Sequence, residues 1–254
     1  MERENTLSIR LFIRNHMKNI LAFPTFLQGF YDAFINKNFY LLYLKGLGRT
    51  LLIAVFAVLI GIVIGFIVAI IRVSPKDNIL IKIIDKIATI YVTIIRGTPV
   101  VVQLLIMYFV VFASMKSWGN GIPIAIITFG LNSGAYVSEI IRGGLNGVDK
   151  GQMEAGRSLG LNWYQTMYKI VLPQGVKAVI PSLFNEFISL VKETSVAGMI
   201  AIIDLTKAAQ MIIAQTMNAF PPYIIIAVMY LVVVLLLQQV QKVLERRFGK
   251  GDIR

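Results

Sequence analysis

The sequence predicts an all-α integral membrane protein with about five transmembrane helices, and two observations support this fold class. Hydrophobic residues make up 57% of the 254-residue chain and charged residues 15%, whereas a soluble globular domain has roughly 45–50% and about 25%. Residues 51–71 are uncharged throughout, and a helix of that length crosses a bilayer core at about 1.5 Å per residue.

Four further segments complete the predicted spans. Residues 97–115 form the second span and residues 118–138 the third. The fourth begins near Ala178, and residues 222–241 form the fifth. An odd number of spans would leave the two chain ends on opposite sides of the membrane.

Basic residues predict which side is cytoplasmic, because loops on that side carry an excess of Lys and Arg. Segments 72–96, 142–177 and 242–254 each hold five basic residues, whereas the two loops between them hold only Lys116 and Lys207. We therefore expect a bacterial-type cytoplasmic membrane with the N-terminus outside and the C-terminus cytoplasmic. Seven basic residues from the N-terminus to residue 49 argue for the opposite orientation of that end. Because the basic residues lie in segments beside apolar runs, we attribute the net charge of +12 to membrane orientation. Nucleic acid is therefore not a predicted partner.

Three regions follow from these spans. Residues 1–45 are an extramembrane or interfacial lead-in, residues 46–245 a transmembrane domain with a cytoplasmic loop at 149–173, and residues 246–254 a cytoplasmic tail. The chain has no cysteine and a single histidine, His16. A thiolate metal site is therefore excluded and a membrane enzyme has little support, so we expect no catalytic and no metal site.

Polar residues at membrane depth are the candidates for function, because an ionisable group there costs about 3 kcal/mol or more. Ser182, Glu186, Ser189 and Glu193 recur at helical spacing in the fourth span, with Asn185 beside them. One interpretation is a polar cavity through which something passes. The other is hydrogen bonding between neighbouring helices.

Similar alternatives apply elsewhere. Asn132, Tyr136 and Glu139 form a stripe in the third span, which either joins helices or lines a path. Glu139 can pair with Arg142 three residues on. Gln103 lies inside the second span.

The loop at 151–173, GQMEAGRSLGLNWYQTMYKIVLP, predicts two short helices with a bend near Leu161. Glycines at 156 and 160 allow close backbone approach, and the second helix is expected to end before Pro173. Such a hairpin suits docking in a partner's groove. A lid packed on the protein's own inner face is the alternative.

Several motifs together give this sequence a family resemblance. Glu-Ala-Gly at 154–156, Gly160, Leu172 and Pro173 resemble the EAA loop of ABC-importer permeases, in which Ala is usual at the position of Gly156. Arg-Gly-Thr-Pro at 96–99, Ala-Tyr-Val-Ser-Glu at 135–139, and the segments at 185–188 and 192–195 resemble the polar amino acid branch, with histidine, glutamine, arginine and cystine permeases. The branch more often has Asp at the position of Glu193. The resemblance covers about residues 40–245.

The resemblance implies a type I ABC importer-like permease with a cytoplasmic coupling-helix hairpin. Its expected partners are two ATP-binding subunits, a second permease chain (identical or related), an extracytoplasmic amino-acid-binding protein and the lipid bilayer. Since the chain has no GxxxxGK[ST] phosphate loop, it would bind no cofactor itself, and ATP and Mg would belong to the partner ATPase. The predicted ATPase-docking residues are Glu154, Ala155, Gly156, Gly160, Leu161, Leu172 and Pro173.

Substrate contacts are implied at Asn185, Glu186 and Glu193, and we add Gln103 and Ser189 as polar neighbours. The two carboxylates suit an ammonium group. Arg96 could meet a substrate carboxylate, with exposure to water or headgroups at the inner boundary as the alternative. An ATP-independent secondary transporter or channel that uses the carboxylates as relays is the second functional hypothesis.

Overall fold

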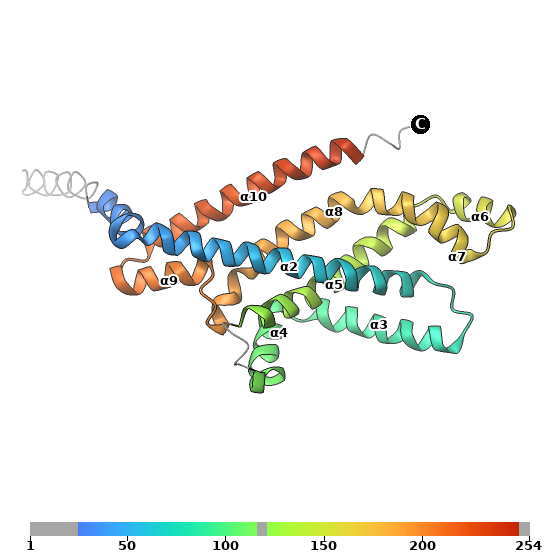
Figure 1. The fold of residues 1–254 in the computed structure, drawn as a ribbon, viewed down its shortest axis with the longest axis horizontal. Helices are drawn as coiled ribbons and strands as arrows, with labels where there is room; N and C mark the ends of the chain where they lie inside the picture. Colours follow the sequence, from blue (N-terminus) through green and yellow to red (C-terminus); the bar gives the residue numbers. More distant parts are fainter. Residues whose placement is uncertain (1–24, 116–120, 249–254) are drawn as a thin grey trace, which may run out of the picture.

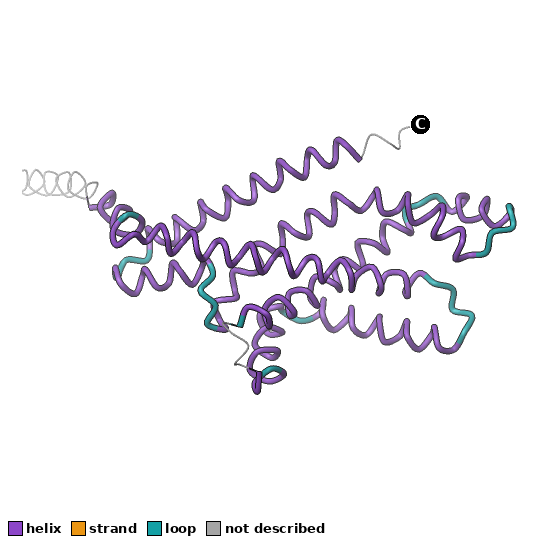
Figure 2. The backbone as a smooth tube through the Cα atoms, in the orientation of Figure 1, coloured by secondary structure: helices purple, strands orange, loops and turns teal. Residues whose placement is uncertain are grey.

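The computed structural model describes residues 25–115 and 121–248. Within these ranges every regular element is a helix (Figure 2). Residues 25–34 are helical. They are followed by η1 (Asn36–Asn38), α2 (Phe39–Val73), α3 (Ile79–Gly97), α4 (Val100–Ile106), η2 (Met107–Val111), η3 (Ala113–Met115), α5 (Ile122–Asn146), α6 (Lys150–Ser158), α7 (Trp163–Thr166), η4 (Met167–Val171), α8 (Leu172–Glu193), η5 (Thr194–Ile200), α9 (Leu205–Thr216) and α10 (Phe220–Phe248).

Three helices are long and apolar enough to cross a membrane unaided, in the segments 36–73, 122–146 and 220–246. Two further candidates are bent pairs: α3 meets Val100–Val111 at 107°, and Trp163–Ile200 meets α9 at 50°. Counting each bent pair as one span gives five. The predicted all-α membrane fold with about five transmembrane helices is therefore confirmed.

The second span differs from its prediction. Its first half is α3, which occupies most of the segment 72–96 that we expected to lie wholly on the inner side. Ala88 and Val92 of α3 pack against Val68 and Ala135. The charged residues of α3 are interspersed with isoleucines, so the segment contains no uncharged run that reveals a helix of the bundle.

The expected helix end before Pro173 is wrong. Val171 and Leu172 keep right-handed helical backbone angles, and α8 continues through Pro173. The five residues of η4, which immediately precede α8, form a π-helical segment. A wider turn of this kind accommodates the ring of a proline and the hydrogen bond that it cannot donate.

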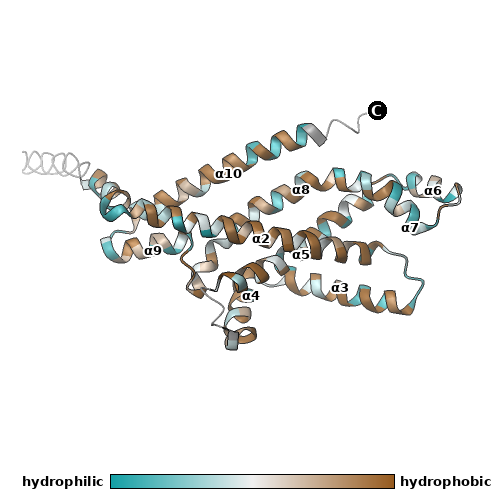
Figure 3. Ribbon diagram, viewed as in Figure 1, coloured by the Kyte–Doolittle hydropathy of each residue, from teal (hydrophilic) through white to brown (hydrophobic). Residues whose placement is uncertain are grey.

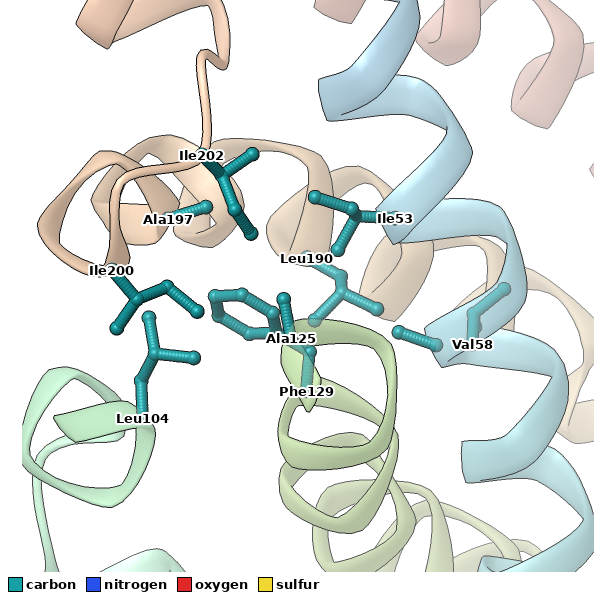
Figure 4. Close-up of a cluster of buried hydrophobic side chains, with 10 residues drawn as sticks. Ile53, Val58, Leu104, Ala125, Phe129, Leu190, Ala197, Ile200 and Ile202 are labelled. Atoms are coloured by element: carbon teal, nitrogen blue, oxygen red, sulfur yellow. The ribbon is translucent and has the colours of Figure 1, made fainter. Parts of the chain in front are cut away.

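Close packing of α2 against α5 forms the centre of the bundle. A Cβ atom at Gly61 would lie 2.7 Å from Ser133 Oγ, and one at Gly130 would lie 2.8 Å from Ile60 Cγ2. Small residues at helix crossings allow this approach in membrane proteins. Beside it, buried side chains of α2, α4, α5, α8, η5 and the segment just after η5 meet in one cluster (Figure 4): Ile53, Ala57, Val58, Leu104, Ala125, Phe129, Leu190, Ala197, Ile200 and Ile202.

The bundle has two distinct ends (Figure 1). The α2–α3 loop, the α6–α7 hairpin and the C-terminal part of α10 lie toward one end, which we call the hairpin end. The start of α2 and the α9–α10 connection lie at the other. Hydrophilic residues gather on the hairpin, whereas the middle of α2 is hydrophobic (Figure 3). The basic segments that we predicted to be cytoplasmic therefore all extend to the hairpin end. Residues 1–24, 116–120 and 249–254, which include parts of the predicted lead-in, the third span and the tail, lie outside the described residues.

Candidate functional site

The loop at 149–173 folds as a two-helix hairpin. Asp149 caps α6 by accepting a hydrogen bond from Gly151 N at 2.6 Å. Asn162 and Gln165 form a capping box at the start of α7, with both hydrogen bonds at 2.9 Å. Between them Gly160 has φ +83°, a left-handed conformation that favours glycine. The predicted bend is present and includes Gly160. Of the two predicted short helices only α6 is separate, because α7 continues through η4 into α8.

Gly156 holds the hairpin together. It is buried, and a Cβ atom there would lie 2.5 Å from Thr166 Cγ2 and 3.1 Å from Ile170 Cδ1. The close approach that we expected of this glycine thus joins α6 to its own hairpin partner. Of the other predicted docking residues, Glu154, Ala155, Gly160 and Pro173 are exposed, and Leu161 and Leu172 are half-buried.

The hairpin also presents apolar side chains that the sequence did not single out. Leu159 is 81% exposed, Tyr168 73% and Tyr164 57%. At its base, Met167 and Val171 pack against Ile141 and Leu145 of α5. The hairpin projects from one end of the bundle (Figure 1), which favours docking over the lid interpretation.

The polar stripe of α8 lies partly against α5. Ser133 Oγ of α5 donates a hydrogen bond to Glu186 Oε1 at 3.0 Å. Glu186, Ser189 and Glu193 are half-buried, whereas Asn185 is exposed. Glu186 therefore has the helix-to-helix bond that one interpretation requires, and the stripe also has a side open for contact.

Gln103 is enclosed by the chain. Its Nε2 donates to Ile95 O at 2.8 Å and to Thr98 O at 3.1 Å, and its Oε1 accepts from Asn132 Nδ2 at 3.1 Å. The side chain is 9% exposed. These bonds join α3, α4 and α5 at the corner between α3 and α4. They give Gln103 and Asn132 a structural role, and the substrate contact of Gln103 stays a prediction.

Glu139 is the centre of an ionic cluster. Arg142 Nη2 lies 2.7 Å from Glu139 Oε2, which confirms the expected pair. Arg72 of α2 also binds Glu139, and Arg96 of α3 lies 3.9 Å from it. The Arg96 guanidinium stacks over the Tyr136 ring at 5.3 Å from its centroid. Sequence reasoning missed the partners from α2 and α3, because they are far from Glu139 along the chain.

A helical bundle with several segments able to cross a membrane, ionisable side chains between its helices and a projecting hairpin defines a multi-pass membrane protein. The comparison with family models is specific: residues 61–250 match the binding-protein-dependent transport system inner membrane component. The chain belongs to this family. The predicted resemblance to ABC-importer permeases is thereby confirmed.

The names of curated relatives are consistent with this family. A putative glutamine transport system permease protein of Rickettsia prowazekii is 39% identical over 80% of this chain and 91% of the relative. An arginine transport system permease protein of Bacillus subtilis is 36% identical over 82% and 93%. An L-cystine transport system permease protein of the same organism is 35% identical over 85% and 90%.

Solved structures share the fold. An amino acid ABC transporter crystallised with histidines matches with a TM-score of 0.75 and 37% identity, over 83% of this chain and 95% of that one. An inward-facing methionine ABC transporter matches with a TM-score of 0.69 over 84% and 98%. At 20% identity, the second match bears on the fold alone.

Proposed function

We propose that this chain is the permease subunit of an ABC importer that carries a polar or charged amino acid across the cytoplasmic membrane. The projecting hairpin is the observation that carries the proposal, because it offers partner subunits an exposed apolar surface around Leu159 and Tyr168. The names of the glutamine, arginine and cystine relatives support the substrate class.

The chain would work in an assembly. Two ATP-binding subunits would bind at the hairpin end and hold the ATP and Mg, a second permease chain would complete the path, and an extracytoplasmic binding protein would deliver substrate at the other end. In this arrangement the N-terminus is outside and the C-terminus cytoplasmic. The basic segments at the hairpin end support that orientation.

The hairpin can transmit motion to the spans. Met167 and Val171 at its base pack on Ile141 and Leu145 of α5, and η4 runs directly into α8. A displacement of the hairpin by the ATPase would therefore move α5 and α8 together. Alternating access requires two such arrangements that differ in affinity for nucleotide or substrate.

The substrate would meet the stripe on α8. Glu186 and Glu193 supply negative charge for an ammonium group, and the exposed Asn185 supplies an amide. A carboxylate between helices suits this role only when the ion pair is supported by hydrogen bonds. Ser133 provides one such bond to Glu186.

Reconstitution in proteoliposomes tests the proposal. With ATPase subunits enclosed and the binding protein outside, radiolabelled amino acid should accumulate only when ATP is supplied, and substrate-loaded binding protein should stimulate ATP hydrolysis. Uptake that follows an ion gradient without ATP would instead favour the secondary transporter or channel, for which the hairpin has no use.

A further inference from the structure

Arg96 is a charged residue within a candidate membrane span, and the proposed function assigns no role to it. It lies at the end of α3, next to the corner that Gln103 braces, and its side chain is 43% exposed. The guanidinium lies over the face of Tyr136. Stacking on an aromatic face leaves the N–H groups at the edge of the guanidinium able to donate in its plane.

The local charge balance leaves Arg96 available. Three arginines surround the single carboxylate of Glu139. Arg72 and Arg142 make hydrogen bonds to it, whereas Arg96 stands 3.9 Å away, the longest of the three contacts. Glu139 is therefore neutralised without Arg96. Three arginines and one carboxylate leave a net charge of +2, and of the three guanidinium groups that of Arg96 is held least closely by Glu139.

One stretch of α5 contacts both Arg96 and the carboxylate stripe of α8. Ser133 binds Glu186 of α8, and Tyr136, three residues further along α5, supports Arg96. Three residues of helix rise about 4.5 Å. One guanidinium and one carboxylate, from two other helices, are thus held at neighbouring turns of a single helix.

We propose that Arg96 binds the α-carboxylate of the transported amino acid, while Glu186 binds its ammonium group. This inference rests on the proposed function. A free amino acid carries both charges on one carbon atom, and the guanidinium fork matches a carboxylate with two parallel hydrogen bonds. Tyr136 and Glu139 are positioning residues, because they orient the guanidinium and do not themselves touch the substrate.

Discrimination between an amino acid and its α-carboxamide tests Arg96 directly, since the amide lacks the anion and keeps the ammonium group. The purified permease–ATPase complex is used without the binding protein, which would impose a preference of its own. L-Glutamine and L-arginine, each with its α-carboxamide, are the probes in an equilibrium binding assay. The wild-type complex should prefer the amino acid at least tenfold. Arg96→Met should reduce the preference to less than about twofold, and Arg96→Lys should retain part of it, because it keeps the charge but loses the fork.

Arg142→Met is the matched control, since it removes another arginine from the same carboxylate. Its preference should equal that of the wild type. Tyr136→Phe should also retain the preference, whereas Tyr136→Ala should lose it.

Each variant is first checked for monodisperse elution with bound ATPase. A preference that survives Arg96→Met, or falls equally in Arg142→Met, would overturn the proposal. Uptake by the wild type in proteoliposomes is measured separately, so equal uptake of amino acid and carboxamide would refute carboxylate recognition and leave amino acid transport standing.

Discussion

Ser133 of α5 donates a hydrogen bond to Glu186 of α8 at 3.0 Å, at the point where Gly61 of α2 packs against the same serine. Three helices therefore meet around one carboxylate. This contact can join helices, hold the carboxylate for a substrate, or do both. Separate substitution of its two members distinguishes the roles.

Glu186→Gln should weaken amino acid uptake, because it removes the charge but keeps a side chain of the same shape. A hydrogen bond to a charged group contributes about 1.5–3 kcal/mol, so we expect the KM for uptake to rise about tenfold or more. Ser133→Ala removes the helix contact and leaves the charge. Its main effect should therefore be a lower melting temperature, with a smaller effect on uptake than that of Glu186→Gln. Unchanged uptake kinetics in Glu186→Gln would make the role of Glu186 structural.

Gly160→Val should abolish transport without preventing membrane insertion. The site has free space, since apart from the adjacent residues no atom lies within 4 Å of the position that a Cβ would take. Its φ of +83° is nevertheless unfavourable for a β-branched residue, with a cost of about 1–2 kcal/mol. The measurement is uptake alongside membrane content. Gly48→Val is the control, because Gly48 is equally open and lies in the ordinary helix α2. Normal uptake in Gly160→Val would contradict the importance of the bend.

Leu159→Glu tests docking at the hairpin more directly. Leu159 is 81% exposed, so the fold should tolerate a charge there. If an ATPase groove covers this side chain, a buried unpaired carboxylate would weaken the complex. Co-purification of the ATPase should fall sharply, while thermal stability of the isolated permease stays unchanged. Retention of the full amount of ATPase would exclude Leu159 from the interface.

Gln103→Leu should destabilise the α3–α4 corner. The substitution leaves Ile95 O, Thr98 O and Asn132 Nδ2 without their shared partner, and each unsatisfied group costs about 1–3 kcal/mol. A lower melting temperature in detergent is the expected result. Gln215→Leu, on the exposed end of α9, should have little effect. A normal melting temperature together with a raised KM would instead support the predicted substrate contact of Gln103.

The orientation of the chain can be tested with single cysteines, because the natural sequence has none. Asp77 lies in the loop at the hairpin end and Gln215 at the other end, and both are exposed. In intact cells a membrane-impermeant maleimide should label Gln215→Cys and spare Asp77→Cys. Permeabilised cells should show both labelled. The reverse pattern in intact cells would invert the proposed topology.

Much of this protein could be predicted from local features of the chain. Uncharged runs reveal α2, α5 and α10, because a long apolar stretch is the local signal of a membrane-spanning helix. Turn residues and caps around Asn162 and Gly160 reveal the hairpin, since they act within a few residues. The stripe from Ser182 to Glu193 depends only on helical periodicity.

Other features depended on helix packing. The amphipathic α3 is held against the bundle by Ala88 and Val92, which no uncharged run indicates. A π-helical segment before α8 allows the helix to pass through Pro173. Gly156 packs against Thr166 and Ile170 of its own hairpin, although the sequence analysis placed it among the ATPase-docking residues.

The sequence by itself determined the membrane class, the number of spans and the place of the hairpin, because each follows from residues that are neighbours along the chain. The tertiary structure alone decided that Glu139 meets Arg72 and Arg96, and that Glu186 meets Ser133. These pairs are 43 to 67 residues apart along the chain, so they form only when helices pack in one register, and that register is set by contacts such as Gly61 against Ser133.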